Sequence, residues 1–448
     1  MQVLQSIRKS NIYLFVIIYL SFFLDNVLLT VVVPIIPDYL FSNQLKTDNS
    51  RLGLKSLSPL QEKYEVLEND NGPLGTLLAS KAFVQLAFTP FIGYLTETVG
   101  CCIPLLLGSC NMLVAAILFA YGNSYGVLVL ARALHGSSSA AIAVSGMSIL
   151  AKNVSQEFRA KLMPLAFGGI ALGVLIGYPL GGAAYQFLGK SAPFLLIAFL
   201  ISISIVLQIL YIEDVTNDVI IDEVNCSQFL NFLQDKQIII TTFTICICTS
   251  TMAILEPCVP MWLLAYLNPP PSRWQLGAVF IPDSIGYFIG SHFAGLLPIA
   301  PWRIAFSALV LAGLSCCALP LAVSIYQLSI PHFGLGLSVG AVDAALVPYL
   351  ATLVDSKGSN QYGTVYALQQ VFVSLAYAFG PLLGGHAVRI LGFPWLMRLI
   401  GFLNLMFCPL LLELEKDPKV GLLDDDYNTP RSYSTLDNTY TSLDEETY

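Results

Sequence analysis

Long apolar runs, separated by short polar segments, dominate the hydropathy pattern of this chain. A transmembrane α-helix needs roughly 20 apolar residues to cross the hydrocarbon core of a bilayer, and about twelve runs reach that length. They fall near residues 11–37, 74–95, 101–121, 126–149, 162–187, 191–212, 237–266, 275–297, 302–324, 329–354, 364–389 and 394–413. The pattern predicts an all-α membrane protein with twelve transmembrane helices.

The composition indicates the same class of protein. The 448-residue chain is 56% hydrophobic and only 11% charged, whereas an ordinary soluble domain carries about 25% charged residues. The first apolar run is too long for a signal peptide, so we expect it to be the first transmembrane helix. The ten cysteines have no metal-site spacing, and no nucleophile–base pair stands out. We therefore expect no cofactor and no enzymatic activity.

Charge divides the chain into four parts. Two six-helix bundles, at residues 1–212 and 237–413, flank an acidic cytoplasmic linker at 213–236, and an acidic disordered tail is expected at 414–448. The net charge of −8 is concentrated in that linker and that tail, so it gives no reason to expect nucleic-acid binding. Lysine and arginine are more frequent in the short loops on the side that holds both chain ends, which favours cytoplasmic termini.

The two halves repeat a pattern around a lone acid. Asp25 is the one charged residue of the first run, and Glu256 is the one charged residue between Lys236 and Arg273. Two prolines follow each of these acids. Such echoed motifs suggest duplicated bundles with a binding site between them at the middle of the membrane.

Six charged residues lie inside apolar runs, away from the run ends. Each costs at least about 2.5–3.5 kcal/mol at a helix centre, so we expect them to face a wet cavity and one another. Four are acids and two are bases, which favours a cationic ligand, and buried acids can also exchange protons. The alternative is a set of salt bridges that only supports the fold. The six residues are Asp25, Lys81, Arg132, Glu256, Asp283 and Asp343.

Three aromatic residues accompany these acids. Tyr287 lies four residues after Asp283, on the same helical face. Trp262 lies six residues after Glu256, and Tyr377 lies in the eleventh run. Aromatic faces attract ammonium groups, although ordinary packing is the alternative for each ring.

The fifth run carries glycines at residues 169, 173, 177 and 181. This spacing makes one smooth face that lets a neighbouring helix approach closely. Its ending, Gly-x-Pro-x-Gly-Gly at residues 177–182, resembles a signature of antiporters of the major facilitator superfamily. The turn "GYLTETVG" at 93–100 resembles a degenerate form of a loop of that superfamily, with Glu97 in place of an aspartate.

Further segments strongly resemble the vesicular amine transporters, which are major facilitator proton antiporters that load monoamines or acetylcholine into secretory vesicles. The likeness spans essentially all twelve runs, and it implies the major facilitator fold with two six-helix halves. The segments are "LDNVLLTVVVPIIPDYL" (24–40), "ASKAFVQLAFTPFIG" (79–93), "ARALHG" (131–136), "AILEPCVPMW" (253–262), "WQLGAVFIP" (274–282) and "VDAALVPYLATLVD" (342–355).

The resemblance implies a role for each matching residue. Residues that would form the substrate site and line the central cavity are Asp25, Asn26, Arg132, Glu256, Tyr287, Asp343 and Tyr377. Among these, Glu256 would face the substrate amine and Asp343 would take part in proton coupling. Lys81 would belong to a charge network with Asp25, and Trp262 would lie in the luminal gate.

The chain departs from the family at three positions. Gln370 stands where the family has an acid that pairs with the second-helix lysine. Lys81 must therefore be stabilised by Asp25, lose its proton or be solvated. Gly358 stands where the family has a histidine implicated in coupling. Asp283 is an acid where the family has a small or apolar residue, and we hypothesise that it replaces the missing carboxylate in proton coupling.

These observations predict a proton-coupled antiporter that loads a cationic amine into acidic secretory or synaptic vesicles. Tyr287 and the "WQLG" segment favour a monoamine, whereas "VDAALVP" and "AYAFGPLLGGHAV" look closer to the acetylcholine branch. The alternatives are a vesicular acetylcholine transporter, a broad organic-cation or drug antiporter, and an amine-binding protein uncoupled from protons.

The expected partners are the amine, protons and the lipid bilayer, and the protein is expected to be a monomer. The pair Leu422–Leu423, followed by acids, resembles the vesicle-sorting signal of the family and would bind sorting adaptors.

Overall fold

The computed structural model describes residues 11–48, 71–215, 227–266, 275 and 278–415, and this part of the chain contains helices and no strand. The first six long helices are α2 (Asn11–Asp48), α4 (Asn71–Thr98), α5 (Cys102–Tyr121), α6 (Tyr125–Asn153), α7 (Gln156–Leu188) and α8 (Ser191–Val215). The second six are α10 (Lys236–Tyr266), α12 (Ile281–Phe293), α13 (Pro301–Ala318), α14 (Ile325–Ser356), α15 (Tyr362–Leu391) and α16 (Phe393–Glu415). The short elements are α9 (Ser227–Gln234), η1 (Ala294–Leu296) and η2 (Leu319–Leu321).

The predicted all-α membrane fold is confirmed. Ten of the described helices are long and apolar enough to cross a membrane, and α4 and α12 complete the six-plus-six arrangement. Several helix bounds differ from the predicted spans, and α2 and α12 are two examples. Helix α2 continues to Asp48, past the expected end at residue 37, and α12 begins only at Ile281. Hydropathy marks the part of a helix that suits lipid, and a helix can continue beyond that part.

The exact boundaries of the two bundles, the linker and the tail stay predictions. Helix α8 extends to Val215, and the amphipathic helix α9 lies in the predicted linker. Residues 216–226 and 416–448, including Leu422–Leu423, lie outside the described residues.

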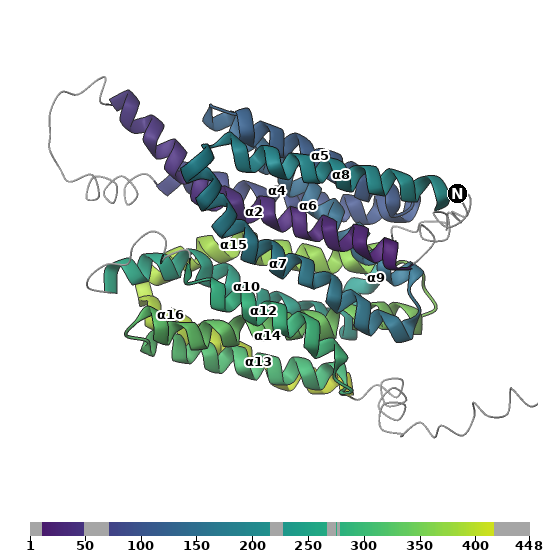
Figure 1. Cartoon of the computed structure of the whole chain (residues 1–448). Coiled ribbons are helices and arrows are strands. Elements are labelled where there is room, and N and C mark those ends of the chain that lie inside the picture. Colours follow the sequence, from purple (N-terminus) through teal and green to yellow (C-terminus); the bar gives the residue numbers. More distant parts are fainter. Residues whose placement is uncertain (1–10, 49–70, 216–226, 267–274, 276–277, 416–448) are drawn as a thin grey trace, which may run out of the picture.

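Each half packs through its own set of helices. In the first half, α6 contacts α4 and α5, and α8 contacts α2 and α5. In the second half, α14 contacts α12 and α13, and α16 contacts α10 and α13. The halves meet where α7 contacts α12 and α14, and where α15 contacts α4 and α6. Figure 1 accordingly shows α7 and α15 between the upper first-half helices and α13, α14 and α16 below.

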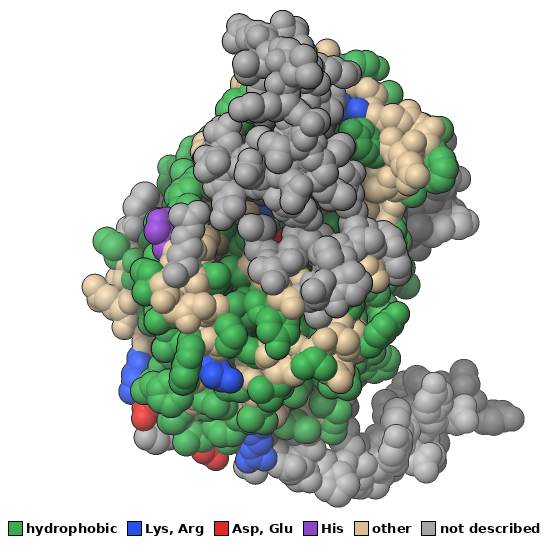
Figure 2. Space-filling view, turned by 90° about the vertical axis from the view of Figure 1, so that its left-hand side faces the viewer, with side chains coloured by type: hydrophobic (Ala, Val, Ile, Leu, Met, Phe, Trp, Pro, Cys, Tyr) green, Lys and Arg blue, Asp and Glu red, His purple; other side chains and the backbone are tan. Residues whose placement is uncertain are grey.

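The outer helices present apolar side chains outward. Large exposed hydrophobic residues include Leu107 on α5, Phe199 on α8, Leu314 on α13 and Phe402 on α16. Such exposed apolar side chains on the outer helices indicate contact with lipid. Figure 2 looks along the helices onto the end of the bundle that lies at the left of Figure 1, where hydrophobic side chains are also frequent among the described residues.

Close helix contacts at glycine position the polar residues of the interior. A Cβ atom at Gly173 of α7 would lie 2.6 Å from the carbonyl oxygen of Phe23 on α2. A Cβ atom at Gly136 of α6 would lie 2.3 Å from the carbonyl oxygen of Lys81 on α4. Since no larger residue fits at either place, α2 and α4 are held against α7 and α6. The expected smooth face of α7 is therefore a packing face.

Candidate functional site

Asp25 is a buried carboxylate on α2 that neutral or titratable groups of α6 hold in place. Its Oδ1 atom accepts a hydrogen bond from the Ser139 hydroxyl at 2.6 Å and lies 3.1 Å from His135 Nε2. Asp25 is 9% exposed and His135 is 0% exposed. The carboxylate is thus fixed on one oxygen, by a hydroxyl and an imidazole.

Lys81 on α4 lies within electrostatic range of Asp25, Arg132 and Glu256. Its ammonium group donates a hydrogen bond to Gln85 Oε1 at 3.3 Å, and it forms no ion pair with another described residue. Lys81 thus has Asp25 in electrostatic range and a hydrogen bond to Gln85, and which of the three expected outcomes follows from Gln370 stays a prediction.

Arg132 on α6 is buried with much of its hydrogen-bonding capacity unused. The residue is 3% exposed, and neither Nε nor Nη1 has a hydrogen-bond partner among the described residues. The guanidinium lies in electrostatic range of Glu256, Asp25 and the Tyr178 hydroxyl. Unused donors on a buried cation need an acceptor, such as water or an oxygen atom of a ligand.

Glu256 on α10 is tied to the opposite half of the molecule. The Tyr178 hydroxyl on α7 donates a hydrogen bond to Glu256 Oε1 at 3.0 Å. The Tyr178 ring stacks on Phe280, with 6.3 Å between ring centroids. This contact bridges the two bundles, and it uses one of the two carboxylate oxygens of Glu256.

Asp343 on α14 and Asp283 on α12 lie on the second half. The Tyr287 hydroxyl donates a hydrogen bond to Asp343 Oδ2 at 2.9 Å. Asp283 is 8% exposed, and its Oδ1 atom has no partner in the described part of the chain. The Tyr377 hydroxyl on α15 lies within electrostatic range of Asp283, Asp343 and Glu256. Tyr377 therefore lies near all three acids of the second half.

The sequence-predicted residues thus form two groups that share Glu256. Asp25, Lys81 and Arg132 lie on the first half, and Asp283, Asp343, Tyr287 and Tyr377 lie on the second half. The structure does not bring Asp283 to Lys81. The charged group in electrostatic range of Asp283 is Glu256 instead, because Asp283 begins the α12 helix in the other bundle.

Three other predicted positions lie beside or away from this centre. The Asn26 side chain donates a hydrogen bond to the Phe22 carbonyl of its own helix at 2.9 Å and lies against Gly173. Trp262 lies apart, stacked on Phe393 with 4.6 Å between ring centroids. Gly358 lies in the turn between α14 and α15 with φ of +63°, a left-handed conformation that favours glycine.

Sequence reasoning missed His135 and Tyr178, which contact the two lone acids. His135 follows Arg132 by three residues, so the two share a helical face. That spacing could have indicated His135. Tyr178 lies in a glycine-rich segment that indicates packing, and nothing in its local sequence points to Glu256.

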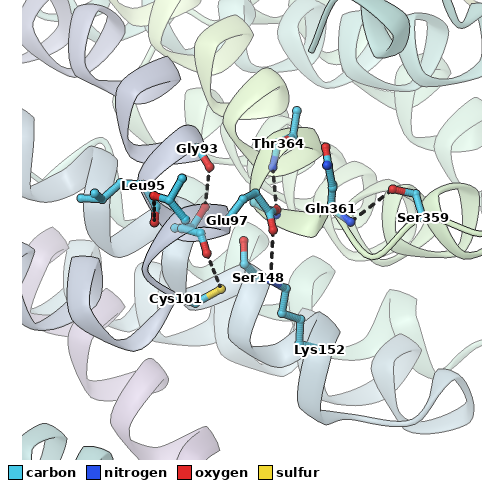
Figure 3. A network of polar contacts seen from close by, with 12 residues as sticks. Gly93, Leu95, Glu97, Cys101, Ser148, Lys152, Ser359, Gln361 and Thr364 are labelled. Atoms are coloured by element: carbon cyan, nitrogen blue, oxygen red, sulfur yellow. Dashed lines mark hydrogen bonds and ion pairs between the residues drawn. The ribbon is translucent and has the colours of Figure 1, made fainter. Parts of the chain in front are cut away.

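A second polar network lies at the end of the bundle where α4 turns into α5, which we call the α4–α5 end. Glu97 accepts hydrogen bonds from the backbone N–H groups of Gly363 at 2.6 Å and Thr364 at 3.3 Å, and pairs with Lys152 at 3.1 Å. Figure 3 shows Glu97 between Lys152 and Thr364. A carboxylate is favourable at the N-terminus of a helix, so Glu97 ties the first half to the start of α15.

Other groups strengthen the α4–α5 end. Arg159 on α7 pairs with Asp355 on α14 and donates a hydrogen bond to the Tyr362 hydroxyl at 3.2 Å. Beside Glu97, burial raises the pKa of the Cys101 thiol to about 12. Cys101 is therefore neutral near pH 7 and leaves the Lys152 charge to Glu97.

The described residues contain no group of three or more histidine, cysteine, aspartate or glutamate side chains placed to hold a metal ion. The carboxylates and aromatic groups of the centre are suited to bind a cation, and carboxylates can also exchange protons.

The sequence was compared with known proteins. The Major Facilitator Superfamily profile matches residues 15–266. The chain is 35% identical to the human synaptic vesicular amine transporter, over 95% of this chain and 93% of that protein. It is 33% identical to the vesicular acetylcholine transporter of Torpedo marmorata, over 91% and 82% of the two chains.

A solved structure agrees in fold. The crystal structure of the human organic anion transporter TETRAN superposes with a TM-score of 0.69 at 17% identity. The superposition covers 89% of this chain and 99% of that one. At this identity the likeness concerns the fold alone.

Proposed function

Because the chain belongs to the vesicular amine transporters of the major facilitator superfamily, we propose that it is a proton-coupled antiporter that loads a cationic amine into acidic secretory or synaptic vesicles. It is a multi-pass membrane transporter and not an enzyme. The proposal concerns the coupling to protons, the kind of amine and the residues that bind it.

The observation that carries the proposal is the absence of direct ion pairs among the central charged groups that the structure describes. Four acids and two bases lie there, and the acids are held by neutral or titratable partners. Their charges are not cancelled pairwise, so with all six groups ionised the centre has an excess of negative charge. That excess favours a cation or protons, and competition between the two is the physical basis of antiport.

The hydrogen-bonding pattern of the central acids favours a monoamine over acetylcholine as the substrate. Tyr178 occupies Glu256 Oε1, and Asp283 Oδ1 has no partner in the described part. An ammonium group with N–H bonds can donate to such oxygens. A quaternary ammonium has no N–H to donate and depends on aromatic faces alone. We therefore place the amine between Glu256, Asp283 and Asp343, with the rings of Tyr287 and Tyr377 beside it.

The remaining site residues take roles that follow from their positions. Asp25 and Lys81 form the charge network on the first half, and Arg132 provides donors toward Glu256. Asn26 lies one position after Asp25 and faces α7. Trp262 lies six residues beyond Glu256 toward the end of α10, where its stack on Phe393 forms the luminal gate. The α4–α5 end is then the cytoplasmic end.

The test is uptake of labelled monoamines and acetylcholine into acidified membrane vesicles, with and without a protonophore. We expect protonophore-sensitive accumulation of a monoamine, lost in Asp25→Asn. Binding without accumulation would instead favour an uncoupled amine-binding protein, in line with Gln370 and Gly358. Uptake of many unrelated cations, with the protein at the cell surface, would favour a broad drug antiporter.

A further inference from the structure

His135 is a buried ionisable side chain near the central charged groups, and the site described so far gives it no role. It lies on α6 and is 0% exposed, with its Nε2 atom 3.1 Å from Asp25 Oδ1. An imidazole in contact with a carboxylate can act as a fixed hydrogen-bond donor or as a site where a proton is gained and lost.

The hydrogen bonds around Asp25 assign the proton on the ring. An ionised carboxylate only accepts hydrogen bonds, so the imidazole N–H toward Asp25 is on Nε2. The Ser139 hydroxyl donates to the same oxygen at 2.6 Å, which supports the acceptor role of Asp25. The other ring nitrogen, Nδ1, then carries a lone pair, and it is buried with no hydrogen-bond partner among the described residues.

Three charged groups, from three helices, surround this imidazole. Burial of the ring opposes a positive charge on it, as do Lys81 on α4 and Arg132 on α6, whereas Asp25 on α2 favours one. The opposing influences of these charges make the protonation of the ring sensitive to any further charge that enters the cavity. A cationic amine held at Glu256 is such a charge, because Glu256 lies in electrostatic range of Lys81 and Arg132.

We propose that His135 and Asp25 form a proton-binding pair, in which His135 Nδ1 takes up the exchanged proton and a bound cationic amine drives that proton off. On uptake, one N–H bond forms at Nδ1 as one O–H bond of a hydronium ion breaks and water is left, and release reverses both changes. The proposal rests on the proposed antiport function and assigns its proton to a particular atom. His135 acts through Asp25 and the amine's charge, so it is a coupling residue.

The variant His135→Gln separates the two roles of the imidazole. A glutamine amide keeps an N–H donor for Asp25 but cannot take up a proton near neutral pH. The matched control is His332→Gln. His332 is also 0% exposed, and its Nδ1 lies 2.9 Å from the Val279 carbonyl on the second half, away from the Asp25 group.

The first measurement counts protons released when serotonin binds to the purified full-length protein. Calorimetry in buffers of different ionisation enthalpy gives this number between pH 5.5 and 8. We expect the wild type and His332→Gln to release a number of protons that changes with pH. We expect His135→Gln to release fewer, by up to one proton per serotonin.

The second measurement is serotonin accumulation in vesicles with the membrane voltage clamped at zero. Each coupled proton multiplies the accumulation ratio by about ten for each unit of pH gradient. Loss of one coupled proton in His135→Gln therefore lowers the plateau about tenfold at a one-unit gradient. Wild-type proton release and a wild-type plateau in His135→Gln would overturn the proposal and leave His135 as a fixed donor.

Failure of the proposed function gives a different result. In that case the wild type itself fails to accumulate any amine, whereas failure of the His135 proposal leaves wild-type accumulation intact. If His135→Gln does not fold, His135→Asn replaces it. The wild-type protein alone also tests the His135 proposal. A number of released protons that stays constant from pH 5.5 to 8 would contradict a titrating histidine.

Discussion

The central charged groups and those of the α4–α5 end are held in opposite ways. At the α4–α5 end, lysine and arginine pair directly with carboxylates, as in Lys152–Glu97 at 3.1 Å and Lys236–Glu413 at 2.8 Å. At the centre, no lysine or arginine in the described residues pairs directly with a carboxylate. There the acids accept hydrogen bonds from serine and tyrosine hydroxyls, and one acid contacts a histidine.

The difference shows how one chain can use the same residue types for two purposes. A direct ion pair cancels charge and fixes the groups that form it, which suits a contact that holds two bundles together. A neutral donor orients a carboxylate without cancelling its charge, so the charge stays available to a ligand. The variants below test this division.

The largest effect is expected at Glu256. Glu256→Gln removes a charge from the centre while keeping the size of the side chain. Loss of one partner of a desolvated charge pair costs about 2–5 kcal/mol, so we expect amine affinity to fall at least about thirtyfold. Competition binding in membranes measures this change in affinity. The control is Glu413→Gln, which removes a charge at the α4–α5 end instead. An affinity within threefold of the wild type would show that Glu256 does not hold the amine.

A smaller effect is expected at the neutral partner of the same acid. Tyr178→Phe removes the hydroxyl that orients Glu256 and leaves the charge. A hydrogen bond to a charged group contributes about 1.5–3 kcal/mol, so we expect amine affinity to fall about tenfold. The same assay measures it, with Tyr94→Phe, on an exposed tyrosine of α4, as control. Unchanged affinity would mean that the hydroxyl serves only the contact between bundles.

At the α4–α5 end, we expect Glu97→Gln to loosen the contact with α15 without changing the amine site. Loss of the charged acceptor exposes Cys101, and we expect maleimide to label it about fivefold faster, equal to about 1 kcal/mol. Because only the thiolate reacts, and burial raises the pKa of Cys101 to about 12, wild-type labelling should rise about tenfold per pH unit between pH 7 and 9. Mass spectrometry of the labelled peptide follows both rates. Equal rates in Glu97→Gln and the wild type would show that Glu97 does not close this end.

The smallest effect is expected for an exposed ion pair. The Lys236 and Glu413 side chains are 69% and 34% exposed, and such pairs contribute about 0–1 kcal/mol. Lys236→Ala should therefore change the thermal unfolding of the detergent-solubilised protein very little. A large loss of stability would show that direct pairs at this end contribute more than their exposure indicates.

The sequence was sufficient to predict the fold class and the central charges. A lone charge in an apolar run is visible without any structure, because lipid makes it costly wherever it lies. Asp25, Glu256 and Asp343 stand out for that reason.

The partners of those charges could not be predicted in the same way. His135 and Asp25 are 110 positions apart in the chain, and Tyr178 and Glu256 are 78 apart. Only packing of the helices brings each pair together. The hypothesis that Asp283 replaces the missing carboxylate in proton coupling came from a departure from the family at one position, and such a departure does not say which groups the acid lies near.

The composition of the central cavity has a consequence for membrane voltage. With all six groups ionised, four acids and two bases give the cavity a formal charge of −2. One bound amine reduces that charge to −1, whereas two bound protons reduce it to zero. A charge that crosses the full field contributes about 2.3 kcal/mol per 100 mV. Under the proposed antiport, voltage would therefore act on the amine-loaded transporter and hardly on a doubly protonated one, so that the two halves of the proposed cycle would differ in their response to the membrane potential.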